Sequence, residues 1–168
     1  MTEKITELID TNLASVIRDT YALDWHGIHG VSHWIRVAEN GLRLAEETGA
    51  DPRVVTLFAF LHDLCRRNDG KDPEHGARAA IWIAEHQWAL GQLTSTALDQ
   101  LRYACEFHTH RRLSPDLTIQ TCWDADRLDY GRVGVRPNPH FLGTAAAQRP
   151  EILNWAWERS QAYRRHPG

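Results

Sequence analysis

A histidine and an aspartate stand side by side in the most apolar stretch of the chain. Residues 59–65 read Ala-Phe-Leu-His-Asp-Leu-Cys, with His62 and Asp63 at the centre. Burying such a polar pair costs free energy unless a partner satisfies it. Imidazole and carboxylate groups are both good ligands for first-row metal ions. We therefore expect His62 and Asp63 to bind a divalent metal ion.

Further candidate ligands lie near the ends of predicted helices, and helix ends can converge in a bundle whose core holds a metal site. Mixed nitrogen and oxygen donors suit Mn, Mg, Fe, Ni or Zn rather than a thiolate site. Adjacent helical residues point about 100° apart, so His62 and Asp63 can share one ion, or Asp63 can lie between two. The further candidates are His33, His75, His108, Asp124 and Asp126.

Basic residues directly follow the His-Asp pair in a polar turn. Arg66 and Lys71 can neutralise phosphate charge, and arginine pairs well with phosphate oxygens. A solvated turn is an equal alternative for Arg66 and the favoured one for Arg67. We expect His86 and His140 to be surface or structural residues, whereas the spacing leaves the other histidines outside the candidate set undecided. These are His26, His29 and His110.

The elements that must position these residues are helices, because apolar residues recur at helical spacing along the chain. The stretch 52–66 is apolar nearly all round, which predicts a central buried helix; a buried strand is the alternative, but length and lack of alternation favour the helix. Ser32, Asp51 before Pro52, and Thr94 or Ser95 are typical helix starts. The predicted helices span about 2–21, 31–48, 52–66, 72–90, 95–108, 117–130, 144–148 and 151–163.

Length and composition predict one all-α domain of about six to eight helices. The 168 residues suit a single domain with a real core, here with motif residues over about 30–134 and a C-terminal loop and Trp-rich helix, 135–168, packed on it. A net charge of −3 gives no basic surplus for binding a nucleic-acid backbone. Three cysteines, an odd number, argue against a disulfide framework. We expect a cytoplasmic protein without a signal peptide or membrane span.

The ordered set His33, His62-Asp63 and Asp126 on helices resembles the HD-domain metal-dependent phosphohydrolases. The resemblance covers about residues 30–134 and rests on His33-Trp-Ile-Arg-Val, on the doublet, and on Asp124-Ala-Asp-Arg-Leu-Asp-Tyr130. It implies an all-α HD-domain fold in which His33, His62, Asp63 and Asp126 are the core metal ligands. Some members bind two metals through further histidines, and His75 and His108 fall where those would lie.

The segment ending in Tyr130 is similar to that of deoxynucleoside triphosphate triphosphohydrolases. This likeness implies that Arg127 and Tyr130 lie near substrate phosphate. The chain is much shorter than those enzymes, however, so their particular substrate is not carried over. The Gly-Tyr-Pro signature of the family's cyclic-dinucleotide phosphodiesterases is absent.

We expect metal-assisted hydrolysis of a phosphoester, with a nucleotide or related small phosphate as substrate. One or two divalent ions would activate water and polarise a phosphoryl oxygen. Asp63 would orient the water, and Arg66 and Arg127 would act in catalysis; Arg66, Lys71, Arg127 and Tyr130 would bind substrate. Two alternatives stay open: a helical nucleotide- or metal-binding sensor without turnover, and a di-iron oxygenase of the same fold. The sequence does not decide whether Asp124 assists Asp126, what loop 131–143 does, or the oligomeric state.

Overall fold

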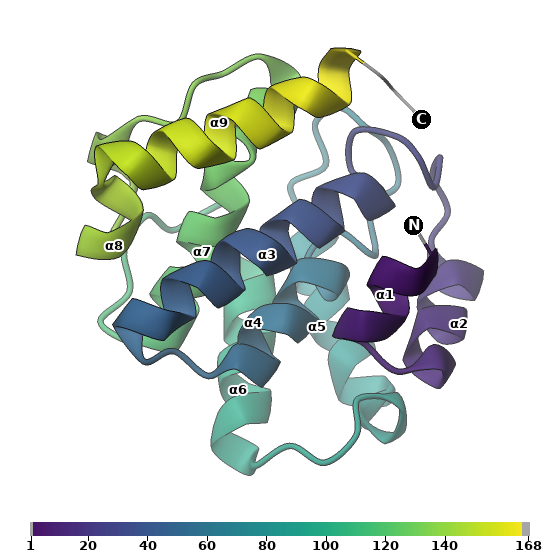
Figure 1. The fold of residues 1–168 in the computed structure, drawn as a ribbon. Helices are drawn as coiled ribbons and strands as arrows, with labels where there is room; N and C mark the ends of the chain where they lie inside the picture. Colours follow the sequence, from purple (N-terminus) through teal and green to yellow (C-terminus); the bar gives the residue numbers. More distant parts are fainter. Residues whose placement is uncertain (1, 166–168) are drawn as a thin grey trace.

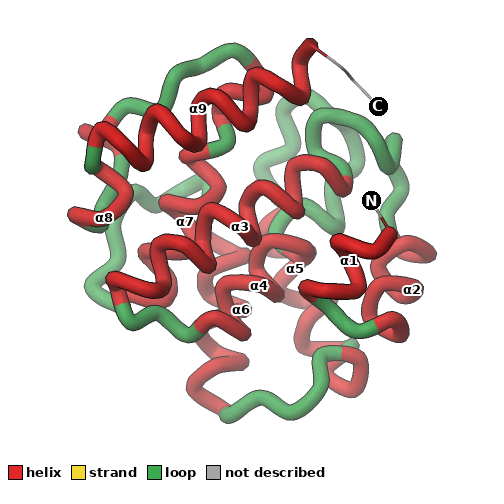
Figure 2. The backbone as a smooth tube through the Cα atoms, in the orientation of Figure 1, coloured by secondary structure: helices red, strands yellow, loops and turns green. Residues whose placement is uncertain are grey.

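The computed structural model describes residues 2–165, with side chains described from residue 3 to residue 161. This part of the chain is all helix and loop, without strands (Figure 2), which confirms the predicted all-α class. The α-helices are α1 (Thr2–Leu8), α2 (Thr11–Thr20), α3 (Val31–Thr48), α4 (Pro52–Leu61), α5 (His75–Glu85), α6 (Ser95–Phe107), α7 (Leu117–Leu128), α8 (Ala145–Gln148) and α9 (Pro150–Arg165). The 3-10 helices are η1 (Gln87–Ala89), η2 (Tyr130–Val133) and η3 (Pro139–Phe141).

Helix α4 is the buried centre of the bundle, as its apolar sequence predicts. Every residue from Val54 to Leu61 is buried, and the helix packs against α3, α6 and α7. Figure 1 shows α3 crossing the molecule in front of α4, with α9 alongside α3 on the outer face. None of the described helices is long and apolar enough to cross a membrane.

Several predicted helix ends are confirmed by their capping contacts. The Asp51 carboxylate accepts hydrogen bonds from the backbone N–H groups of Arg53 and Val54, and Pro52 opens α4. Gly49 ends α3 in the left-handed conformation, with φ of 71°, which glycine adopts without strain. Thr94 caps α6 through its side chain. These local contacts fix where the helices that carry the candidate ligands begin and end.

Other predicted boundaries are wrong, which raises the number of α-helices in the described chain to nine. The predicted helix 2–21 is two helices, because the Asp10 carboxylate accepts a hydrogen bond from the Leu13 N–H and starts α2. The N-cap of α3 is Gly30 rather than Ser32. The helix predicted over 52–66 ends at Leu61. The helix predicted over 72–90 is the shorter helix α5 followed by η1, and the helix predicted over 117–130 ends at Leu128, before η2.

The early end of α4 places the His-Asp pair in a turn. After Leu61 the backbone continues in tighter bonds, from the Leu64 N–H to the Leu61 carbonyl and from the Arg66 N–H to the Asp63 carbonyl. Such three-residue bonds are common where a helix ends. His62 and Asp63 therefore extend into the interior from the C-terminal end of the central helix.

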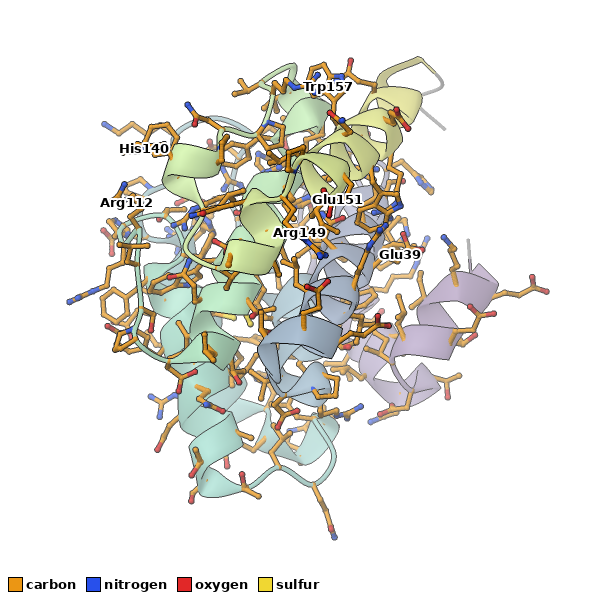
Figure 3. All side chains as sticks on the ribbon, turned by 60° about the vertical axis from the view of Figure 1, so that its left-hand side comes forward. Glu39, Arg112, His140, Arg149, Glu151 and Trp157 are labelled. Carbon is orange, nitrogen blue, oxygen red and sulfur yellow. The ribbon has the colours of Figure 1, made fainter. Side chains whose placement is uncertain are left out.

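The C-terminal helices pack on the bundle through a small apolar cluster of their own. Helices α8 and α9 contact α3 and α7, and α9 also covers η2. The cluster consists of Leu44, Leu128, Leu142, Ala146, Ala147, Ile152 and Ala156. Figure 3 shows this side of the molecule, with Arg149 and Glu151 close together where α8 joins α9.

Gly41 allows α3 to approach α4 and α7 closely. A Cβ atom at this position would lie 2.3 Å from Val55 Cγ1 and 3.3 Å from Ala125 Cβ. Gly41→Ala should therefore overpack the core and lower the free energy of unfolding by about 1–3 kcal/mol. Urea denaturation measures this loss. The exposed Glu46→Ala, on the same helix, should change stability by less than about 0.5 kcal/mol, and an equal loss in both variants would contradict the packing argument.

Candidate metal centre

Five helices each bring a candidate ligand to one place from an end or a buried face. His33 lies in the first turn of α3, and His62 is the C-cap of α4. His75 opens α5, and His108 is the C-cap of α6. Asp63 follows His62, and Asp126 comes from α7. All six are buried.

Four of these residues form the first cluster. His33 Nε2 lies 3.2 Å from His62 Nε2, 3.7 Å from Asp63 Oδ2 and 3.5 Å from Asp126 Oδ1. His62 Nε2 lies 3.5 Å from Asp63 Oδ2 and 3.8 Å from Asp126 Oδ1. Neighbouring ligands on a first-row ion, each about 2.1 Å from the metal, are roughly 3.0–3.4 Å apart. The structure therefore brings these donors close to ligand spacing.

The second cluster uses the other oxygen of Asp63. His75 Nε2 lies 3.1 Å from Asp63 Oδ1, and His108 Nε2 lies 3.8 Å from the same atom. The two imidazole nitrogens are 2.9 Å apart. Asp63 thus lies between the clusters, with Oδ2 toward the first and Oδ1 toward the second. Arg66 Nη1 approaches this second cluster, 3.4 Å from Asp63 Oδ1.

The Nδ1 atoms of the four histidines all contact oxygen acceptors. With Nδ1 carrying the proton, each ring presents a bare Nε2 to its cluster, the form that binds metal. The acceptors are the Asp129 carboxylate for His33 (2.7 Å), the Phe58 and Ala59 carbonyls for His62 (3.1 Å each), the Asp72 carbonyl for His75 and the Cys105 carbonyl for His108 (2.7 Å).

Electrostatics favour the protonation states that metal ligands need. Burial, together with nearby Arg132 and His62, lowers the pKa of His33 well below its usual value. Burial and His62 lower the pKa of His108 to about 3. Burial alone would raise the pKa of the Asp63 carboxyl, but His62 and the hydrogen bond from His29 hold that pKa well below its usual value. At neutral pH, His33 and His108 are neutral and Asp63 is ionised.

The donor arrangement fits a bound cation. One pair of bare Nε2 atoms faces each other in each cluster, His33 with His62 and His75 with His108, and lone pairs at this distance repel unless a positive charge lies between them. Asp126 Oδ1 is enclosed and has no hydrogen-bond partner among the described residues. A buried carboxylate oxygen without a partner is costly. One or two divalent ions would satisfy these atoms, held by His33, His62, Asp63 and Asp126 and by Asp63, His75 and His108.

The structure adds residues that the sequence left unassigned. His29, one of the undecided histidines, contacts Asp63 Oδ2 through Nδ1 at 2.8 Å. Asp129 accepts from Arg36 Nε at 2.6 Å and from Arg36 Nη2 at 2.9 Å, and it orients His33 through the contact described above. The i+3 spacing from His33 to Arg36 and from Asp126 to Asp129 was the available signal, since residues three apart share a helix face.

The loop before α3 is what brings His29 to Asp63. Gly30 permits this path, because a Cβ atom at position 30 would lie 2.2 Å from the Trp25 carbonyl oxygen. Arg132 holds the loop from the other side by donating from Nε to the Ile28 carbonyl at 3.1 Å. The contact between His29 and Asp63 thus depends on the close approach of the backbone at Gly30 to Trp25 and on Arg132, which is far away in the sequence.

The predicted substrate-binding residues lie at different places. Arg66 is buried at the second cluster, whereas Lys71 is exposed in the loop before α5. Tyr130 is 39% exposed, and its hydroxyl pKa is raised by nearby Asp126 and by burial. Arg127 Nη1 donates to the Arg112 carbonyl at 2.8 Å, and the described structure joins its guanidinium to neither cluster.

Asp124 lies outside both clusters and anchors the loop before α8. It accepts hydrogen bonds from the Gly143 N–H and from both the N–H and the hydroxyl of Thr144, each at 2.8–2.9 Å. Gln120 Nε2 donates to it at 2.8 Å. Its partners are therefore structural, and Asp126 is the member of the pair that faces the clusters.

We expect a divalent ion to stabilise the protein through the first cluster. An ion at 100 times its dissociation constant adds about 2.7 kcal/mol to the free energy of unfolding, so Mn²⁺ should raise Tm by several degrees. His62→Ala should remove most of this shift. Thermal denaturation with and without Mn²⁺, supported by elemental analysis, measures the effect.

His140→Ala is the matched control for His62→Ala. His140 is exposed beside Arg112 on the outside of the molecule (Figure 3), and its removal should leave the Mn²⁺-dependent shift intact. A shift that persists undiminished in His62→Ala would contradict the assignment of this cluster.

Asp129 should affect metal affinity without being a ligand. Asp129→Asn weakens the hold on His33 Nδ1 and leaves Arg36 without its carboxylate, and changes of this kind typically cost 10–100-fold, about 1.4–2.7 kcal/mol, in metal affinity. Isothermal titration with Mn²⁺ measures the dissociation constant. The exposed Asp99→Asn should bind as the wild type does, and an unchanged constant in Asp129→Asn would refute the orienting role.

Comparison with known proteins supports the fold. No family model matches the chain. A symmetrical bis(5'-nucleosyl)-tetraphosphatase from Staphylococcus aureus is 26% identical over 121 residues, 60% of this chain, and the chain spans 59% of that relative's length. A crystal structure described as a predicted HD superfamily hydrolase, from an uncultured Thermotogales bacterium, superposes with a TM-score of 0.68 at 23% identity, covering 96% of this chain and 95% of the other. The chain therefore has the HD-superfamily fold, which confirms at the level of fold the resemblance seen in its sequence.

Proposed function

We propose that the chain is a metal-dependent phosphohydrolase that cleaves a phosphoester or phosphoanhydride bond in a nucleotide or related small phosphate. The observation that carries this proposal is the Asp63 carboxylate, whose two oxygens face two histidine clusters. Two metal ions about 3.5–4 Å apart are a recurring solution for phosphoryl transfer. The Staphylococcus aureus relative, whose name describes a nucleotide tetraphosphatase, is in line with this reaction class.

The charge at the site also supports an anionic substrate. Three buried carboxylates, Asp63, Asp126 and Asp129, are accompanied by three buried guanidinium groups, those of Arg36, Arg66 and Arg132. The formal charges of these side chains cancel. One or two divalent ions would then make the centre positive by two or four charges. Such a centre attracts a phosphate group strongly in a site of low dielectric constant.

The chain's own residues have distinct roles in the proposed reaction. A bound divalent ion would supply Lewis acidity and lower the pKa of a water molecule. Asp63, ionised and held by His29, orients the attacking water by accepting its hydrogen bond. Arg66 stabilises negative charge that develops on the phosphoryl group near the second cluster. Tyr130, which is partly exposed near Asp126, contacts the substrate.

A hydrolysis panel tests the proposal. Nucleoside mono-, di- and triphosphates and dinucleoside tetraphosphates are each incubated with Mn²⁺, Mg²⁺, Fe²⁺, Ni²⁺ or Zn²⁺, and released phosphate and nucleoside products are measured. Asp63→Ala should lower kcat/KM by more than about a hundredfold, since removing only an orienting partner of a metal ligand costs up to that much. Circular dichroism checks that the variant is folded, and Asp99→Ala is the control.

Three outcomes would count against the proposed reaction. Full activity in folded Asp63→Ala would exclude this mechanism. Nucleotide binding without release of any product would favour the sensor module. Bound iron with substrate-dependent oxygen consumption would favour the oxygenase.

A further inference from the structure

The arginines around the two clusters differ in how fully their donors are used. Arg36 pairs with Asp129 through two hydrogen bonds. Arg66 donates from Nε and Nη2 to backbone carbonyls of its own turn and from Nη1 to Asp63. Arg127 donates from Nη1 and Nη2 to backbone carbonyls of the loop after α6. Each of these guanidinium groups is held by the protein itself.

Arg132 is the exception. It donates from Nε to the Ile28 carbonyl at 3.1 Å and from Nη1 to the Asp129 carbonyl at 3.3 Å. Its Nη2 has no hydrogen-bond partner in the described part of the chain. The side chain is only 6% exposed, so this donor belongs to a fixed and largely buried group. Among the described residues, Nη2 does not belong to the enclosed polar atoms that lack a partner, so this donor reaches the surface of a fixed side chain, where a ligand or water can accept its hydrogen bond.

The place of Arg132 indicates which ligand that is. Its Nη1 lies 3.9 Å from Asp126 Oδ1, the enclosed oxygen that lacks a hydrogen-bond partner at the first cluster. One phosphoryl group is large enough to touch both an ion held by that oxygen and the guanidinium. The partly exposed ring of Tyr130 lies beside it, with its centroid 5.8 Å from Arg132 Cζ.

We propose that Arg132 is a substrate-binding residue that donates from Nη2 to a phosphoryl oxygen of the ligand at the first cluster. Its other two nitrogens fix its position by bonds to the loop of His29 and to the turn after Asp126. This role deepens the proposed function and rests on it for the identity of the ligand. It also differs from the sequence-based expectation, which assigned substrate binding to Arg66, Lys71, Arg127 and Tyr130.

Binding of inorganic phosphate tests the role without requiring turnover. Isothermal titration of the Mn²⁺-loaded protein measures the dissociation constant for wild type, Arg132→Gln, Arg132→Lys and Arg127→Gln. Arg132→Gln should weaken phosphate binding at least about tenfold, and Arg132→Lys by less, because a charge-assisted hydrogen bond is lost in the first and a charge is kept in the second. Manganese content should stay at the wild-type level in both.

Arg136→Gln is the matched control. Arg136 is exposed in the same loop region and contacts Asn154, and its substitution should leave phosphate affinity unchanged. Wild-type affinity in Arg132→Gln, or a larger loss in Arg127→Gln than in Arg132→Gln, would overturn the proposal. Failure of the wild type to bind phosphate at all would overturn it too. Phosphate binding through Arg132 without hydrolysis of any nucleotide would support this inference and refute the proposed function alone.

A direct observation covers the case in which the variants do not fold. Crystals of the wild-type protein grown with Mn²⁺ and inorganic phosphate should show a phosphate oxygen within hydrogen-bond distance of Arg132 Nη2. A phosphate bound at the first cluster with no contact to Arg132 would refute the role.

Discussion

The sharing of one carboxylate by two sets of histidines is the constraint around which this molecule is arranged. Asp63 is buried, ionised and placed so that each oxygen faces a different pair of imidazole nitrogens. A carboxylate in such a place needs compensation from several directions, because burial penalises its charge. The fold provides it by ending helices around that group rather than by filling the space with apolar side chains.

Rigid support for this arrangement comes from the central helix and its neighbours. α4 is buried along almost its whole length, so the residues that follow it start from a fixed point. Gly41 lets α3 lie close enough to α4 and α7 for His33 and Asp126 to meet His62. The packing of the core therefore sets the geometry of the clusters. A change in side-chain volume where α3 contacts α4 and α7 would shift the positions of the candidate ligands.

The sequence was sufficient to predict those features of the fold and of the candidate site that depend on neighbouring residues. The spacing of apolar residues predicted the all-α class, and Asp51-Pro52 predicted the start of α4. The polar pair His62-Asp63 within an apolar run singled out these two residues as candidate metal ligands. The sequence was insufficient where contacts depend on long-range folding. The contact of His29 with Asp63 needs a loop path that Gly30 and Arg132 make possible, and no pattern around His29 encodes that path. The break at Asp10 was missed because apolar spacing continues across it.

Asp124 has a consequence for how this fold can change. It ties the far end of the 131–143 loop to α7 through Gly143 and Thr144, while Arg132 ties the near end to the turn after the same helix. The residues between these two attachments lie on the outside, and most of them are exposed. Mutations there can accumulate without moving the buried candidate ligands. This segment can thus change in sequence while the buried histidines and aspartates of both clusters keep their places.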